Sequence, residues 1–152
     1  MDEEDINKVA AGATLHCLTG CAIGEIAGLI IGTAFGLSNL LTIVIAVTLA
    51  FIFGYTLSLI PIVKAGVSLR AAAVTVLAAD TLSIATMEIV DNAVMAIVPG
   101  AMGGGLVNPL FWLILPLSLG VAFLAAFPVN RHLLQRGQGH ALIHQKLHSG
   151  KH

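Results

Sequence analysis

The sequence predicts an all-α integral membrane protein, a bundle of four transmembrane helices. Of its 152 residues, 57% are hydrophobic and only 10% are charged, and the mean hydropathy is +0.96. Soluble domains carry roughly 25% charged residues, so the composition alone indicates a protein that contacts the lipid bilayer. The apolar residues form four stretches, each as long as the roughly 20 residues that a spanning helix needs. A net charge of -1 provides no basic surface and excludes nucleic-acid binding.

Short polar or glycine-rich breaks separate the four spans, which we predict at residues 9–37, 40–63, 69–98 and 108–130. Ser38 and Asn39 form the first break, and residues 64–68 form the second. Ser68 is expected to cap the third helix, because a serine hydroxyl accepts a hydrogen bond from a free N–H group of the first turn. Residues 99–105 contain Pro-Gly and three consecutive glycines, which favour a loop before the fourth helix.

The spans divide the chain into an acidic N-terminus (1–8), a transmembrane domain (9–130) and a His-bearing tail (131–152). With four spans, every basic residue falls on the side that holds both termini: Lys8, Lys64, Arg70, Arg131, Arg136, Lys146 and Lys151. The positive-inside rule then predicts that both termini are cytoplasmic, in a bacterial inner membrane. The start of the chain is acidic, unlike the basic start of a secretory signal, so the first helix is expected to stay in the membrane.

The first span carries two thiols, a histidine and a glutamate. At about 100° per residue, Cys17, Cys21 and Glu25 fall on one stripe, whereas His16 points about 100° away from Cys17. Glycines recur every four residues beside this stripe: Gly20, Gly24, Gly28, Gly32 and Gly36. Small residues at this spacing let another helix approach closely. We therefore expect the first helix to be central, with a neighbour packed tightly on its glycine face.

The third span is acidic in its middle, where Asp80 and Asp91 share one face and Glu88 lies at its edge. An ionised group at membrane depth costs roughly 2.5–3.5 kcal/mol on insertion scales and usually marks a functional site. We expect the first and third helices to face each other or an inner cavity, with the second and fourth turned towards lipid or partner subunits. Met87 and Met95 share the acidic face and are expected to be ordinary core residues.

Depth can be compared between the first and third helices because they run in the same direction. Aligning their centres, near Ile23 and Ile84, places Asp80 between the two thiols. The same alignment places Glu88 and Asp91 one to two turns further outward, as an exit route or a second site.

These residues suit a transition-metal cation, with copper or zinc favoured. Thiolates select soft ions and carboxylates suit harder ones, and cysteines at i and i+4 can both point at one ion. The predicted metal residues are His16, Cys17, Cys21, Glu25, Asp80, Glu88 and Asp91. The predicted function is binding and translocation of this cation across the bilayer by a homo-oligomer, because four spans leave little room to enclose a path.

Three other interpretations stay open. The carboxylates would also serve a proton- or sodium-coupled pathway in which the thiols are structural. A membrane enzyme or redox subunit would need a cofactor, for which the sequence offers no motif, so an enzyme is the less favoured reading. A non-transporting accessory subunit would leave the acidic face unexplained.

The tail repeats histidine every four residues. His140, His144 and His148 would form one stripe on a helix and are predicted as a possible additional metal site. A solvated basic tail at the lipid headgroups explains the same residues equally well.

The segments His16 to Glu25, Ala79 to Ser83 and Met87 to Asn92 resemble a small bacterial membrane family known only as a domain of unknown function. The segment Phe127 to Arg131 and the His-bearing tail are also similar, so the resemblance covers nearly the whole chain. It implies a four-helix membrane protein in a setting of metal handling, copper in particular, with no settled activity.

Overall fold

The computed structural model describes residues 2–136 and is all-helical over that range. The helices are α1 (Glu3–Phe35), α2 (Asn39–Lys64), α3 (Leu69–Ile97) and α4 (Pro109–Gln135), with a short 3₁₀ helix η1 (Gly105–Val107) before α4. All four α-helices are long and apolar enough to cross a membrane. The predicted fold class is therefore confirmed. His140, His144 and His148, like the basic residues after Arg136, lie outside the described residues.

The helix boundaries agree closely with those predicted from the sequence, except at the start of the first helix and at the end of the fourth. α1 begins at Glu3, six residues before the predicted start, since its first turn is acidic and therefore suits a helix N-terminus. α4 continues through Pro128 to Gln135. The Ser38 hydroxyl caps α2, and the Ser68 hydroxyl accepts from the Ala71 N–H at 3.4 Å, as predicted.

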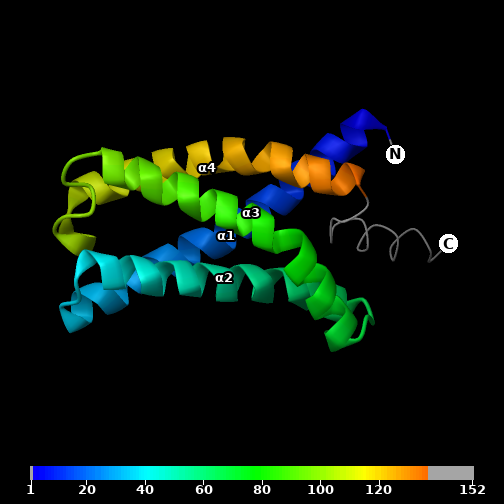
Figure 1. Ribbon diagram of the computed structural model, residues 1–152, viewed down its shortest axis with the longest axis horizontal. Helices are drawn as coiled ribbons and strands as arrows, with labels where there is room; N and C mark the ends of the chain where they lie inside the picture. Colours follow the sequence, from blue (N-terminus) through cyan, green and yellow to red (C-terminus); the bar gives the residue numbers. More distant parts are fainter. Residues whose placement is uncertain (1, 137–152) are drawn as a thin grey trace.

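The four helices run along the long axis of the molecule (Figure 1). The α1–α2 and α3–α4 connections lie at one end, which we call the loop end. The start of α1, the α2–α3 connection and the end of α4 lie at the opposite, terminal end. α1 packs most extensively on α2, and α3 on α4, whereas α1 and α3 cross with a smaller contact in the middle. The bundle is thus two helical hairpins joined along a seam.

The glycine face of α1 packs directly on the backbone of α2. A Cβ atom built on Gly20 would lie 2.5 Å from Gly54 Cα, and one on Gly24 would overlap the backbone of Ala50. Real Cβ atoms do not approach other atoms so closely, so the two helices need glycine here. The expected tight neighbour of the first helix is therefore α2. Apart from this contact the second helix turns outward, as expected, since α2 is the least buried of the four helices. The residues of α2 that meet the glycine face are small: Ala46, Ala50 and Gly54.

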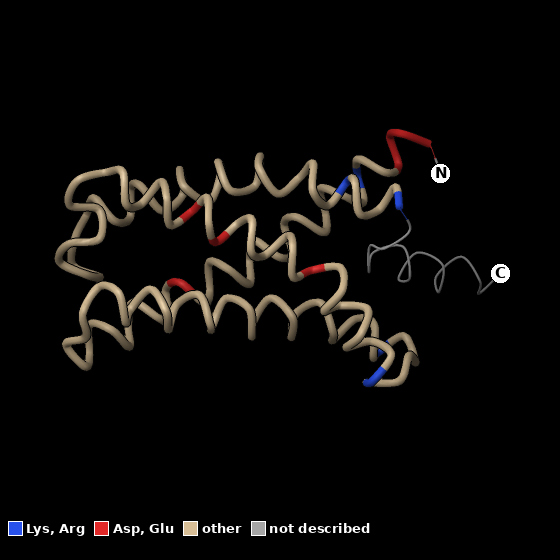
Figure 2. The backbone as a smooth tube through the Cα atoms, viewed as in Figure 1, with Lys and Arg blue, Asp and Glu red and all other residues tan. Residues whose placement is uncertain are grey.

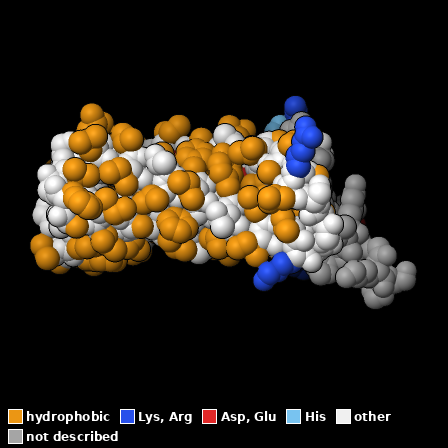
Figure 3. Space-filling model, turned by 90° about the horizontal axis from the view of Figure 1, so that it is seen from below, with side chains coloured by type: hydrophobic (Ala, Val, Ile, Leu, Met, Phe, Trp, Pro, Cys, Tyr) orange, Lys and Arg blue, Asp and Glu red, His pale blue; other side chains and the backbone are white. Residues whose placement is uncertain are grey.

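Charge and apolar surface are segregated along the bundle. Hydrophobic side chains cover much of the face seen in Figure 3, and Lys and Arg gather near the terminal end. Figure 2 shows the same clustering, with acidic positions inside the helices as well as at the N-terminus. The described basic residues are Lys8, Lys64, Arg70, Arg131 and Arg136. This surface fits lipid contact around the helices, with a polar terminal end.

Candidate functional site

Two rows of side chains face each other where α1 crosses α3. Cys17, Cys21 and Glu25 form the α1 row, one helical turn apart. Ser83, Met87 and Asp91 form the α3 row, also one turn apart, and each lies opposite the α1 residue 66 positions earlier in the chain. We call these the facing rows. Because each member carries a sulfur or an oxygen atom, the seam of the bundle offers such groups at three successive depths.

The middle of the facing rows is a contact between two sulfur atoms. The Cys21 thiol donates to the Met87 thioether, with 3.9 Å between Sγ and Sδ. Both side chains are buried, Cys21 at 3% and Met87 at 0% exposure. The Glu88 carboxyl is also within reach of the Cys21 thiol. A thiol, a thioether and a carboxyl group therefore converge from two helices.

Towards the loop end the facing rows finish in a pair of acids. The Glu25 and Asp91 carboxyl groups lie within hydrogen-bonding reach of each other, and the Ser118 hydroxyl of α4 lies close to Asp91. Asp91 is only 4% exposed, and its Oδ1 atom is buried with no hydrogen-bond partner. A hydrogen bond between two carboxyl groups requires that one of them carry a proton, because a carboxylate has no donor. This pair is therefore able to hold and release a proton.

Towards the terminal end the facing rows meet a fourth acid, Asp80. Cys17 lies opposite Ser83 and within electrostatic range of Asp80. Cys17 and Ser83 are fully buried, and Asp80 is 1% exposed. A carboxyl group so far from water is costly unless charges or hydrogen bonds compensate it. Asp80 thus extends the polar seam beyond the thiols.

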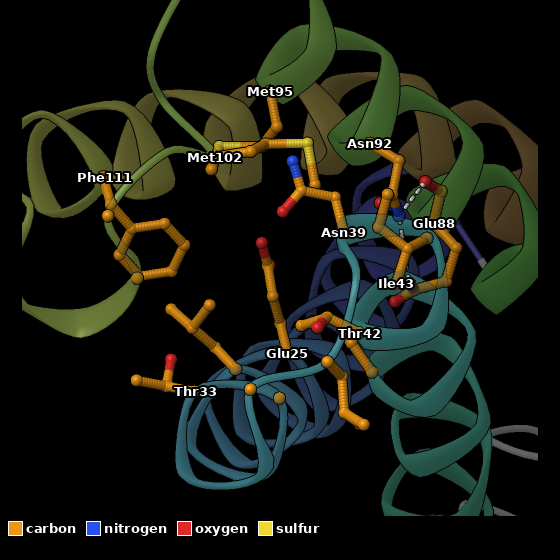
Figure 4. Close-up of a pocket in the computed structure, with 17 residues that line it drawn as sticks. Glu25, Thr33, Asn39, Thr42, Ile43, Glu88, Asn92, Met95, Met102 and Phe111 are labelled. Carbon is orange, nitrogen blue, oxygen red and sulfur yellow. Dashed lines mark hydrogen bonds between the residues drawn. The ribbon is translucent and has the colours of Figure 1, made fainter.

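A cavity of about 300 Å³ opens beside the facing rows at the loop end. Figure 4 shows the Glu25 side chain pointing into it from α1, with Met95 and Met102 on one side and Glu88 with Asn92 on another. The Asn92 side-chain amide donates to the Glu88 backbone oxygen at 2.9 Å and approaches its carboxylate at 3.5 Å. The cavity therefore reaches two acids of the seam, the half-buried Glu25 and the buried Glu88, and brings two thioethers close to them.

The depth alignment expected from the sequence was wrong by about one and a half turns. We aligned Ile23 with Ile84, whereas the structure places Cys21 opposite Met87. The centre of α1 moves to Thr19 once the helix is counted from Glu3 to Phe35, which accounts for most of the error. Asp91 therefore lies level with Glu25, and Glu88 near Cys21, rather than further outward. Asp80 lies on the terminal side of Cys17 and not between the thiols.

The predicted metal residues come together along the seam but do not form a compact metal centre. Among residues 2–136, no group of three or more His, Cys, Asp and Glu side chains is placed to hold a metal ion. His16 does not belong to the facing rows, and its buried Nε2 atom has no hydrogen-bond partner. The remaining six are spread over the length of the seam: Cys17, Cys21, Glu25, Asp80, Glu88 and Asp91.

Sequence reasoning assigned no role to several polar or sulfur-bearing residues of this region. Met87 is part of the buried core, as expected of a methionine, yet it also supplies the sulfur opposite Cys21. Its position one turn before Asp91 on the acidic face was the available signal. Met102 and Ser118 come from the α3–α4 connection and from α4. Nothing in the local sequence connects these two with the acidic face.

The fold and the site define a four-helix chain that fits an integral membrane protein, with acidic and sulfur-bearing side chains buried in its interior. The chain belongs to the DUF4396 family, a domain of unknown function, whose model matches residues 7–139. The resemblance seen in the sequence is thereby confirmed at the level of the family. No curated protein and no solved structure matched the chain.

Proposed function

We propose that the protein binds a transition-metal cation, copper or zinc, between α1 and α3 and moves it across the membrane. The observation that carries the proposal is the alignment of the facing rows with the cavity. A cation entering the cavity meets Glu25 and Glu88 first, then the sulfur pair of Cys21 and Met87, and then Cys17 with Asp80. Each step is about one turn, so an ion is never far from a negative charge or a soft ligand.

Three acids of the seam support transport rather than a structural role: Glu25, Glu88 and Asp91. None of these three forms an ion pair with a Lys or Arg among residues 2–136, where the ion pairs of α1 and α4 lie at the surface. Carboxylates in a bilayer usually pair with a partner or line an ion path. A mobile cation supplies the charge that the fixed side chains lack.

The proposed orientation has both termini in the cytoplasm of a bacterial inner membrane. All described basic residues gather at the terminal end, where the positive-inside rule places the cytoplasm. The cavity then opens towards the opposite side. We further propose that the protein is a homo-oligomer, since four helices arranged as two hairpins enclose little space on their own.

The test is metal flux into proteoliposomes that contain the purified protein and an enclosed metal indicator. We expect Cys17→Ser/Cys21→Ser and Asp80→Asn to abolish flux of copper and zinc. Glu4→Gln is the matched control on α1, because Glu4 is exposed and pairs at the surface with Lys8. Flux at the wild-type rate in the double cysteine variant and in Asp80→Asn would refute the proposal.

The acid pair of Glu25 and Asp91 supports a second candidate, a proton- or sodium-coupled pathway. Such a pathway needs a protonatable pair that the cavity can reach, and Glu25 lines the cavity. It predicts that Glu25→Gln abolishes proton movement, whereas a protein without cysteines remains active and binds no metal. A pH-sensitive dye inside the same vesicles measures this directly, and loss of proton movement on removing the cysteines would contradict it.

A further inference from the structure

We propose that Cys21, Met87 and Glu88 form a binding site for a soft monovalent cation, Cu(I) in the cell and Ag(I) as its analogue. This inference deepens the proposed function, because it names the ion and the point on the seam where the ion rests. In this site Met87 is a metal ligand as well as a core residue.

The distance between the two sulfur atoms fits shared coordination. Thiolate sulfur lies about 2.3 Å from Zn²⁺, and we use the same bond length for Cu(I). At that length, sulfurs 3.9 Å apart subtend an angle of about 115° at a common ion, so both can bind it together. The unbranched methionine side chain adjusts readily if the ion prefers a wider angle. The ion therefore fits between Sγ and Sδ without movement of either helix.

Charge balance favours a monovalent over a divalent ion. When the ion binds, the Cys21 S–H bond breaks, a sulfur–metal bond forms and the proton passes to the Glu88 carboxylate within its reach. A single positive charge on the thiolate and thioether, beside a protonated Glu88, leaves the site neutral. Zn²⁺ with the same proton transfer would leave the site with one positive charge in a buried position, and it would be neutral only if the proton left the site altogether. Zn²⁺ also takes four ligands in structural sites, and only two sulfurs converge here.

The cavity offers a path to the proposed site that is lined by ligands suited to a soft cation. Glu88 lines the cavity on one side and approaches Cys21 on the other. Met95 and Met102 line the same cavity (Figure 4), and thioethers suit soft ions. A soft cation therefore meets sulfur before it reaches the buried thiol.

The experiment is a titration of the full chain in detergent, with Ag(I) or with Cu(I) kept reduced by ascorbate, against a competing chelator. X-ray absorption of the copper-loaded protein reports the ligand atoms. We expect sulfur scattering at about 2.3 Å and at least a tenfold loss of affinity in Met87→Leu, which conserves side-chain volume. Cys21→Ser should remove the sulfur signal. Tail histidines would contribute nitrogen scattering in every variant and so cannot imitate it.

The control introduces a thioether at a position on α3 that does not face Cys21. Leu82 is on α3 but faces outward, at 55% exposure, so Leu82→Met in the Met87→Leu background should not restore affinity. Equal Ag(I) and Cu(I) affinities in wild type and Met87→Leu, or a copper spectrum without sulfur, would overturn the site while metal flux could still stand. Sulfur-bound copper without flux would instead overturn translocation and leave the site intact.

Discussion

Replacing Gly24 by alanine tests the packing on which the whole bundle depends. The added Cβ would overlap the Ala50 backbone and lie 2.7 Å from the carbonyl carbon of Leu49. Carbon atoms prefer separations of about 3.5–4.0 Å, so α1 and α2 must separate by about 1 Å. Gaps of that size forfeit a quarter to a half of the dispersion energy at each contact. The contacts of Gly20 and Gly28 on the same face would loosen together.

The expected cost is about 1–3 kcal/mol of unfolding free energy, the usual range for overpacking. Alanine also gains about 1 kcal/mol over glycine in helix propensity, which partly masks the cost. Gly12→Ala is the matched control, because Gly12 lies on the same helix and its Cβ would meet nothing within 4 Å. The difference between the two variants cancels the propensity gain and isolates the packing.

The assay is reversible unfolding in mixed micelles, followed by the fluorescence of the single tryptophan, Trp112. Trp112 donates its indole N–H to the Leu106 oxygen at 2.9 Å, so its surroundings change on unfolding. Gly24→Ala should unfold at a lower denaturant fraction than Gly12→Ala. Equal midpoints would refute the close α1–α2 contact.

Three smaller perturbations probe the polar contacts with the same unfolding assay. Asn130→Ala removes the 2.9 Å hydrogen bond to Thr14 and should cost about 0.6 kcal/mol, rising to about 1.7 at most, as between other membrane helices; no change would mean that the buried bond contributes nothing. Ser68→Ala removes the N-cap of α3 and should cost about 1 kcal/mol, with Ser68→Thr retaining most of it. Arg131→Gln breaks a pair with the exposed Glu3 and should cost less than about 1 kcal/mol; a larger loss would show that Arg131 holds the terminal end together.

The sequence was most informative where the bilayer itself acts as the constraint. Hydrophobic length and the polar breaks located all four helices, and the serine at position 68 located a helix start, because both signals are local. The glycine repeat also identified a close-packed face on α1. It did not identify the partner, because any helix with small residues fits such a face. The partner was indicated by three small residues of α2 that we did not take into account: Ala46, Ala50 and Gly54.

The relative depth of α1 and α3 could not be predicted from the sequence, for a different reason. Relative depth depends on where each helix begins, and the acidic first turn of α1 extends the helix beyond its apolar stretch. An error of six residues at one end shifts a helix centre by three, or about 4.5 Å. This shift is close to one helical turn, so it was enough to place Glu25 and Asp91 at different depths in the alignment predicted from the sequence. Predicting that Cys21 faces Met87 likewise required the relative register of α1 and α3. The sequence alone does not distinguish a methionine that packs in a core from one that lines a site.

The division of the bundle into two hairpins determines how the facing rows could change partners. Within each hairpin the helices share extensive contact, and in α1–α2 the backbones themselves interlock. The hairpins contact each other through α1–α4 and α2–α3 as well as through the smaller α1–α3 crossing, so sliding one hairpin against the other would disturb all three contacts. Such a movement would also exchange every partner in the facing rows at once. A displacement of one turn would take Cys21 from Met87 to Ser83 or Asp91 and replace sulfur by oxygen, so the relative position of the hairpins determines the type of ligand opposite each α1 residue.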